Sequence, residues 1–287
     1  MKRWIWQYEN YPNFTYQFDK LEHLLQKIAM EQGYLLALSQ TLSQDMITQR
    51  QCDALLNETL STAAIEGEIL NRDSVKASIA KKFGLRECDD KKIVDATDNL
   101  VSILIDANTN YDKALTLERL FGWHNALFPK GYSGLRKINT ASFRGEDTMQ
   151  IVGGSIGKEV VYYEAPPRDR LEQEMQRFLA WFNAEKPTLI KACIAHLWFV
   201  IIHPFDDGNG RITRAITDLV LSHIENSKIS RLYSMSSTIN ENKKAYYAAL
   251  ENTTGYIQKE RNPLDITLWC EWFLNTLYQS LLDAKGR

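Results

Sequence analysis

Apolar residues along most of this chain recur at the spacing of an α-helix. Between positions 18 and 42, leucine and isoleucine residues fall three, four or seven positions apart, which places them on one face of a helix. The same pattern predicts a mainly α fold, with further helices at residues 48–66, 69–83, 93–108, 116–127, 169–184, 187–203, 210–225, 240–251 and 265–283.

Residues 129–168 follow a different pattern. Glycine and proline are frequent there, and two β-prone pieces, MQIVGG and KEVVYYEA, stand on either side of a glycine-rich turn. This arrangement predicts a small β-hairpin at residues 148–164. Earlier in the chain, the polar stretch 84–92 predicts a boundary between an N-terminal helical region, residues 1–85, and a second domain, residues 86–287.

Composition narrows the class of protein. Hydrophobic residues make up 44% and charged residues 24% of the chain, and the formal net charge is −2, so nothing favours nucleic acid or a membrane surface as a partner. No apolar run has the length of a membrane span, and the N-terminus does not resemble a secretory signal. The four cysteines form no CxxC pair, which argues against a zinc site or disulfide framework. We expect a cytoplasmic protein, and a homo-oligomer stays open.

The segment 196–221, HLWFVIIHPFDDGNGRITRAITDLVL, combines several groups suited to phosphate chemistry. A helix is predicted to end near His203, where Pro204 enforces a break, and a second helix to open at Gly210. His203 has an ordinary pKa suited to general-base catalysis at neutral pH. Asp207 is a candidate Mg²⁺ ligand, since this ion prefers carboxylate and phosphate oxygens.

The same segment offers an anion site. Gly208, Asn209 and Gly210 can bring backbone N–H groups close to an anion at the positive end of a helix. Arg211 and Arg214 are three positions apart and project from the first turns of that helix, an arrangement suited to a polyphosphate. Each feature alone is common in turns and on helix surfaces. Their occurrence together within the twelve residues 203–214 favours a functional site over a chance combination.

Residues 203–214, HPFDDGNGRITR, resemble the Fic family motif HxFx(D/E)GNGRxxR and match it at every specified position. The resemblance implies a Fic-type helical bundle and a protein adenylyltransferase, which moves AMP from ATP onto a Ser, Thr or Tyr hydroxyl of a target protein. It implies that His203 deprotonates this hydroxyl, which attacks the α-phosphate and expels pyrophosphate. Phe205 would anchor the loop in the core.

The resemblance also assigns the phosphate and metal ligands. Asp207 would hold Mg²⁺ against the phosphates, and the motif spacing selects it over the neighbouring Asp206. The remaining motif residues would bind the nucleotide phosphates, with Gly208, Asn209 and Gly210 as an anion cradle and Arg211 and Arg214 on the β- and γ-phosphates.

Two further segments resemble parts of Fic proteins. The hairpin at 148–164 resembles the flap on which a target protein docks by strand addition, although a hairpin can also be merely stabilising. Residues 239–250, INENKKAYYAAL, resemble the helix that closes over the adenine. This makes Asn240, Tyr246 and Tyr247 candidates for contact with the nucleotide, with ordinary helix packing as the alternative.

Residues 62–67, TAAIEG, fit the pattern (S/T)xxxE(G/N) of the inhibitory helix of many Fic proteins, on the helix predicted at about 48–67. The resemblance implies a built-in brake formed by Thr62, Glu66 and Gly67. A Glu66 carboxylate that reaches Arg214 would neutralise the cation meant for the γ-phosphate. Misplacing the α-phosphate slows a reaction on the order of 10²-fold. The alternative is that Glu66 pairs with a lysine or faces water and that Gly67 ends the helix.

Three other functions stay open. A Fic-type site can also remove AMP, with the inhibitory glutamate positioning water, or transfer another phosphate-containing group. A regulatory module could use the pocket to sense nucleotides, which the presence of both His203 and Asp207 disfavours. A metal hydrolase could use His196, His203 and Asp207, but the HExxH spacing of such enzymes is missing.

Overall fold

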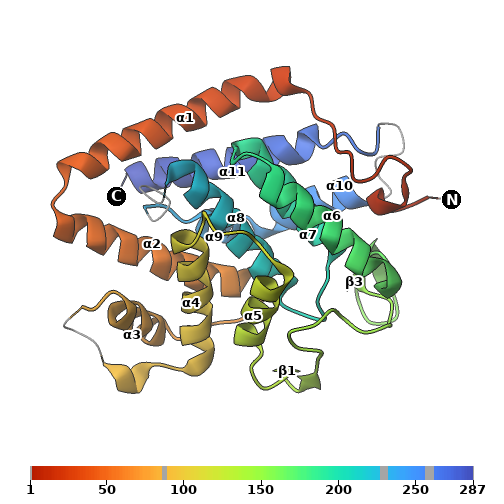
Figure 1. Ribbon diagram of the computed structural model, residues 1–287, viewed down its shortest axis with the longest axis horizontal. Helices are drawn as coiled ribbons and strands as arrows, with labels where there is room; N and C mark the ends of the chain where they lie inside the picture. The colour runs from red at the N-terminus through yellow and green to blue at the C-terminus, as the bar shows by residue number, and fades with distance from the viewer. Residues whose placement is uncertain (1, 86–88, 227–231, 256–261, 287) are drawn as a thin grey trace.

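The computed structural model describes residues 2–85, 89–226, 232–255 and 262–286, and its helices dominate the fold (Figure 1). Its α-helices and 3₁₀ turns (η) are η1 (Ile5–Gln7), α1 (Phe18–Thr41), α2 (Gln44–Ile65), α3 (Arg72–Lys82), η2 (Asp90–Lys92), α4 (Asp95–Thr109), α5 (Leu117–Leu127), η3 (Arg168–Arg170), α6 (Leu171–Ala184), α7 (Leu189–Ile202), α8 (Asn209–Glu225), α9 (Met235–Glu241), α10 (Lys243–Thr254) and α11 (Thr267–Lys285). The mainly α fold expected from the sequence is confirmed.

Two short antiparallel pairs of strands accompany the helices in the described residues. The predicted hairpin is β3 (Gln150–Gly153) paired with β4 (Val160–Glu164), with a bulge between Ile151 and Val152. A second pair, β1 (Tyr132–Ser133) with β2 (Arg136–Lys137), was not predicted from the sequence. Its strands have two residues each, too short to give an alternating pattern of apolar and polar positions.

Side-chain caps set several helix starts. Ser43 accepts a hydrogen bond from the Met46 amide at the start of α2, and Asn71, rather than Asp73, caps α3 by accepting from the Ser74 amide. The predicted helix 240–251 is wrong in its extent. Ser234 starts α9 early, and the non-helical backbone of Asn242 (φ −130°, ψ 49°) separates α9 from α10.

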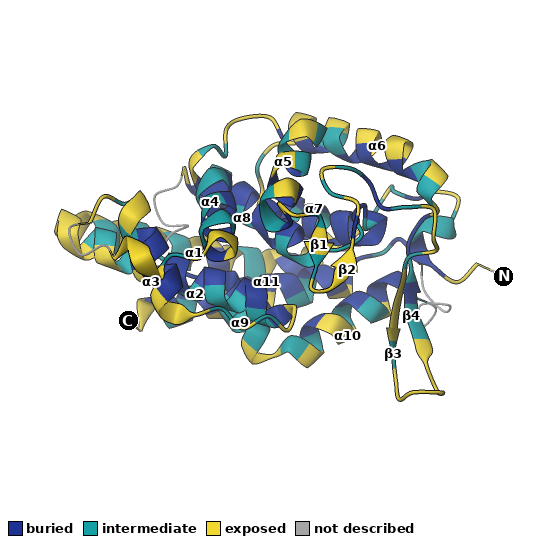
Figure 2. Cartoon of the chain, turned by 90° about the horizontal axis from the view of Figure 1, so that it is seen from below, coloured by how far each residue is buried: buried dark blue, intermediate teal, exposed yellow. Residues whose placement is uncertain are grey.

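The buried core centres on α7 and α8, which pack against each other (Figure 2). Almost every residue of α7 from Lys191 onward is buried. Helix α1 lies along α11, and α2 packs against α9, so the residues before 85 share buried surfaces with the C-terminal helices. The domain boundary near residue 85 stays a prediction, and residues 86–88 lie outside the described residues. None of the described helices has the length and apolarity needed to cross a bilayer.

The aromatic N-terminus covers one side of the hairpin. The Trp6 indole donates to the Glu164 carbonyl oxygen at 2.7 Å, and the Arg3 guanidinium donates to that of Val161 at 3.1 Å. The Trp4 ring meets Tyr163 edge-to-face, with 5.7 Å between ring centroids. Strand β4 is therefore flanked by the N-terminal segment, while β3 is exposed and has no second neighbouring strand among the described residues.

Candidate active site

His203 stands at the point where α7 ends. Its backbone is left-handed (φ 51°, ψ 59°), and Pro204 follows. The ring nitrogen Nδ1 lies 3.4 Å from the Val200 carbonyl oxygen. Because a carbonyl oxygen only accepts hydrogen bonds, Nδ1 carries the proton and Nε2 keeps a free lone pair. Burial, and after it the positive charge of Arg144, lowers the pKa of His203 to about 4. The ring is therefore neutral at pH 7 and able to accept a proton.

Hydrogen bonds between two of its own residues stabilise the loop after His203. The Asn209 side chain accepts from the Phe205 amide at 3.0 Å and donates to the Phe205 carbonyl oxygen at 2.8 Å. Phe205 is fully buried and stacks on His124, with ring centroids 4.2 Å apart. Phe205 thus anchors the loop as expected. The Asn209 side chain shapes the loop, so this residue can meet an anion through its backbone N–H.

The two neighbouring acids of the loop have different surroundings. The Asp206 carboxylate accepts from the backbone and side chain of Asn139 and from the Gly145 amide, so it ties the loop to the segment before the hairpin. The Asp207 side chain is 39% exposed and accepts from the Ser133 hydroxyl and the Gly208 amide. The choice of Asp207 over Asp206 as a Mg²⁺ ligand stays a prediction.

Arg214 is buried against helix α2. Its Nε donates to the Thr62 hydroxyl at 2.7 Å, and Nη2 donates to the Thr62 carbonyl oxygen at 2.9 Å and to the Glu66 carboxylate at 2.6 Å. Burial alone would lower the pKa of Arg214, but Glu66 together with Tyr246 and Tyr247 more than offsets it, and the pKa is raised. Glu66 therefore reaches Arg214 rather than a lysine or open water.

Arg211 is held by a second acid from the same turn. Its Nη1 donates to the Glu68 carboxylate at 2.9 Å, and its guanidinium lies over the Phe128 ring at 5.3 Å. Within the described part of the chain, Arg211 Nε and Arg214 Nη1 are buried and lack a hydrogen-bond partner. Guanidinium N–H groups left without a partner are suited to binding the oxygens of an anion.

The Glu66 carboxylate lies against the start of α8. A Cβ atom added at Gly210 would stand 2.0 Å from Glu66 Oε1 and 3.1 Å from Arg214 Nη1. Gly208 is also specifically required, because its φ is 86° and a Cβ there would meet the Phe128 ring at 2.8 Å. The glycines thus leave room for an anion at the helix N-terminus, where Glu66 now supplies a negative charge.

Some of these groups border one cavity of about 620 Å³, whereas Asp207, Gly208 and Arg211 are not among its lining residues. Its lining combines Glu66 from α2, His203, Arg214 from α8, hairpin residues such as Val152, and Tyr247 from α10. A neutral histidine, an anion site and an exposed strand therefore border the same space.

Comparisons with known proteins agree with this geometry. Residues 114–221 match the family model described as "Fic/DOC family", and residues 4–85 match "Domain of unknown function (DUF4172)". A crystal structure of a Fic family protein from Desulfovibrio desulfuricans G20 superposes with a TM-score of 0.67 at 24% identity, over 96% of this chain and 76% of that one. This chain contains a Fic domain at residues 114–221.

Curated relatives of this Fic protein carry transferase names. The chain is 26% identical over 175 residues to the protein adenylyltransferase Fic of Culex quinquefasciatus, which is 59% of this chain and 32% of the relative. It is 28% identical over 123 residues to a uridine 5′-monophosphate transferase of Xanthomonas campestris pv. campestris, 37% of this chain and 21% of the relative. The chain thus matches less than a third of the length of these relatives. Both relatives are thus named as transferases of nucleotides.

Of the three residues predicted to contact the adenine, two line the cavity and one does not. Tyr246 and Tyr247 line the cavity from α10, where the Tyr247 hydroxyl donates to the Ile65 carbonyl oxygen at 3.1 Å. Tyr246 is 2% exposed, and its hydroxyl contacts His196 Nε2 at 2.9 Å. Asn240 lies on α9, beyond the helix break, and is not part of the cavity lining.

His196 does not join the motif. Its Nδ1 lies 2.9 Å from the Thr217 hydroxyl, and its Nε2 contacts Tyr246, so both ring nitrogens are used in the core. Among the described residues, no group of three or more His, Cys, Asp or Glu side chains is placed to hold a metal ion. The geometry therefore gives no support to a metal hydrolase built on His196, His203 and Asp207.

Sequence reasoning missed three residues that shape the Fic site. The Glu68 carboxylate accepts a hydrogen bond from Arg211. The only hint of this in the sequence is that an acidic residue stands two positions after Glu66. His124 accepts from the Ala141 amide with Nδ1 and contacts the Asp207 carbonyl oxygen with Nε2, at 3.0 Å. Arg144 contacts the backbone of His203. The last two lie far from the motif in sequence, and no local pattern marks them.

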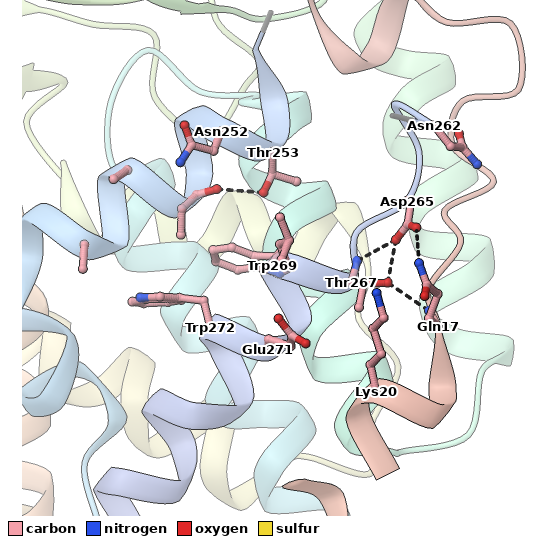
Figure 3. Close-up of a pocket in the computed structure, with 14 residues that line it drawn as sticks. Gln17, Lys20, Asn252, Thr253, Asn262, Asp265, Thr267, Trp269, Glu271 and Trp272 are labelled. Atoms are coloured by element: carbon pink, nitrogen blue, oxygen red, sulfur yellow. Dashed lines mark hydrogen bonds between the residues drawn. The ribbon is translucent and has the colours of Figure 1, made fainter. Parts of the chain in front are cut away.

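A larger cavity, of about 1060 Å³, lies on another face of α10 and does not contain these groups (Figure 3). It is bordered by Trp269 and Trp272 of α11 and by polar residues near the start of α1. Asp265 accepts from Gln17 and Thr267, so polar side chains at this rim bond to each other. Its charged lining residues are Lys20, Asp265 and Glu271, and its lining contains neither a histidine nor an arginine.

Proposed function

We propose that this Fic protein transfers AMP from ATP to a Ser, Thr or Tyr hydroxyl of a target protein, and that Glu66 restrains the reaction. One observation carries the proposal. A neutral His203, the glycine loop and Arg214 border one cavity, and Glu66 occupies Arg214 there. A general base beside an anion site is the minimum equipment for nucleotidyl transfer.

In the proposed reaction, His203 Nε2 takes the proton of the target hydroxyl. The hydroxyl oxygen then bonds to the α-phosphorus of ATP, the bond from this phosphorus to its bridging oxygen breaks, and pyrophosphate leaves. Arg211, Arg214 and the backbone N–H groups at the start of α8 would hold the phosphates. Asp207 would hold Mg²⁺, which neutralises phosphate charge when bound.

The proposed brake acts on both arginines. Thr62 and Glu66 occupy Arg214, and Gly67, with φ 80°, turns the chain so that Glu68 reaches Arg211. The γ-phosphate of ATP would have to displace Glu66 to reach Arg214. While Glu66 stays in place, the α-phosphate is held away from its reactive position, and this costs rate.

The hairpin is the proposed docking site for the target. Ile151, Val152 and Val160 expose apolar side chains there, and Ile151 and Val152 also line the cavity. Because the N-terminal segment flanks β4, an extended target segment would add to the free side of β3. This would bring its hydroxyl toward His203.

A second candidate is transfer of UMP or removal of AMP. Because one relative is named uridine 5′-monophosphate transferase, UTP is tested as the donor beside ATP. Because Glu66 lines the cavity, where it could position water, removal of AMP from a modified protein is tested as well. Both use the same residues.

The test incubates wild type, Glu66→Gly and Glu66→Gly/His203→Ala with α-labelled ATP and Mg²⁺, alone and with bacterial lysate. Label on protein with Glu66→Gly and not with the double variant supports the proposal. Label from α-labelled UTP but not ATP would replace AMP by UMP. Release of AMP from modified protein by the wild type, with no transfer by any variant, would reassign the site to removal.

A further inference from the structure

Arg144 is a buried cation without a carboxylate partner. Its residue is 1% exposed, and none of the ion pairs in the described part of the chain includes it. The other buried or half-buried arginines around the core, such as Arg119 and Arg214, pair with acids. Burying a charge that forms no ion pair costs free energy, and the Asp206 carboxylate attracts this one only from beyond ion-pair distance, so its hydrogen bonds must hold it there.

All three hydrogen bonds that Arg144 donates go to backbone carbonyl oxygens. Its amide donates to Pro204 at 2.9 Å, its Nε donates to His203 at 2.7 Å, and its Nη2 donates to Pro166. Pro166 follows Ala165, whose amide donates to Met149 at 3.0 Å and closes the base of the hairpin. The Arg144 guanidinium thus connects two segments: the loop on which His203 lies and the base of the hairpin.

The conformation of His203 explains why such a joint is needed. A non-glycine residue with positive φ is uncommon, and a residue before proline is normally extended. Backbone conformations of this kind are strained and persist only where surrounding contacts hold them. Arg144 holds two successive carbonyl groups, those of His203 and Pro204, at this point.

We propose that Arg144 is a positioning residue that fixes the imidazole of His203 relative to the hairpin on which the target docks. The inference rests on the proposed transferase function and adds to it a residue outside the motif. The guanidinium fork is essential, because Nε and Nη2 donate to carbonyl groups of two different segments. A lysine keeps the positive charge but has one ammonium group, and a glutamine keeps one donor group but no charge.

These two substitutions separate geometry from charge. In the Glu66→Gly background, Arg144→Lys and Arg144→Gln should each lower kcat on the order of 10²-fold, while the Kd for ATP changes by less than about threefold. Arg144→Gln alone should also move the acidic limb of the kcat profile to higher pH. Removal of the cation raises the pKa of His203, and only the neutral ring acts as the base.

Arg119→Lys and Arg119→Gln are the matched controls. Arg119 also donates to backbone carbonyl oxygens, those of Asp106 and Asn110, but these lie on and after α4, away from the His203 loop and the hairpin that Arg144 contacts. Its variants should lower the melting temperature without moving kcat or its pH profile. An equal loss of kcat in both pairs of variants, or a change of kcat below about threefold in the Arg144 variants, overturns the proposal.

Two further readouts do not depend on activity. A crystal structure of Arg144→Gln should show His203 outside the left-handed region, and an NMR titration should show its pKa raised. If the Glu66→Gly parent transfers no nucleotide, the proposed function fails. The crystal structure then decides the role of Arg144 by itself, and an unchanged His203 backbone and ring position overturn it.

Discussion

At the scale of single residues, the candidate site depends on a histidine that is kept neutral. Burial and the Arg144 charge lower the pKa of His203 to about 4, and the Val200 carbonyl oxygen fixes the proton on Nδ1. The base is therefore ready over the whole physiological pH range. A free histidine, with a pKa near 6.5, would lose part of its basic form below neutral pH.

His203→Ala in the Glu66→Gly background should abolish AMP transfer while ATP still binds. The imidazole removes the proton, whereas the phosphates are held by the start of α8 and its arginines. Transfer assays with α-labelled ATP, paired with calorimetric titration of ATP, check this. Transfer that survives the substitution would remove His203 as the base.

Glu225, a buried acid outside the site, predicts a pH dependence of stability. Oε1 accepts from Gln32 and Tyr233, whereas Oε2 has no partner in the described residues. Burial raises the pKa of Glu225 to about 8, well above its value in an unfolded chain. The folded state therefore binds the extra proton between these two pKa values. Stability from this group is full below the unfolded pKa and falls as the pH rises, by up to about 1.4 kcal/mol per pH unit.

Glu225→Gln should remove this part of the pH dependence, because an amide does not titrate. Urea unfolding of both proteins between pH 5 and pH 8.5 measures it. The variant should gain stability relative to wild type as the pH rises. Parallel curves for the two proteins would show that Glu225 is ionised in the folded state.

At the scale of elements, the turn after α2 places two glutamates in ion pairs with two arginines of α8. Helix α2 ends at Ile65, and the chain turns through Gly67, so Glu66 and Glu68 reach Arg214 and Arg211 of α8. The end of α2 is also tied to α10, because the Tyr247 hydroxyl donates to the Ile65 carbonyl oxygen.

Glu66→Gly should raise the rate of AMP transfer on the order of 10²-fold. Adding Glu68→Gln should tighten ATP binding by a further factor of about two to five, since the pair with Arg211 is partly exposed and such pairs contribute up to about 1 kcal/mol. Initial rates and ATP titrations of both variants test this, with the exposed Glu118→Gln as control. An unchanged rate for Glu66→Gly would show that Glu66 is not the brake.

At the scale of the whole molecule, the N-terminal residues support the hairpin that borders the site. The Trp6 indole donates to the Glu164 carbonyl oxygen, and the Arg170 guanidinium lies over the Trp6 ring at 5.1 Å. Residues 4–85, which match a domain of unknown function, thus contact the strand that flanks the cavity.

Trp6→Ala should destabilise the protein by about 2 kcal/mol, less than for a fully buried tryptophan because the ring is half-buried. Trp6→Phe should cost about 1 kcal/mol, since it keeps the ring packing and loses one hydrogen bond. Urea unfolding measures both. Equal costs for the two variants would show that the hydrogen bond, rather than the packing, holds the hairpin.

The sequence by itself determined the helices and the motif. Periodic apolar positions placed α1, α2, α7 and α8 within a few residues of their ends, because burial of one face follows directly from helical spacing. The motif at 203–214 is contiguous, so its histidine, glycines and arginines share one loop and one helix start whatever the rest of the fold does.

Only the tertiary structure decided which distant groups meet that motif. The contact between Glu66 and Arg214 spans 148 residues, and that between Arg144 and His203 spans 59. The break at Asn242, which places Asn240 on α9 rather than on α10, was likewise not predicted from the sequence. Such contacts depend on how helices pack, and a local pattern of residues carries no record of packing between distant segments.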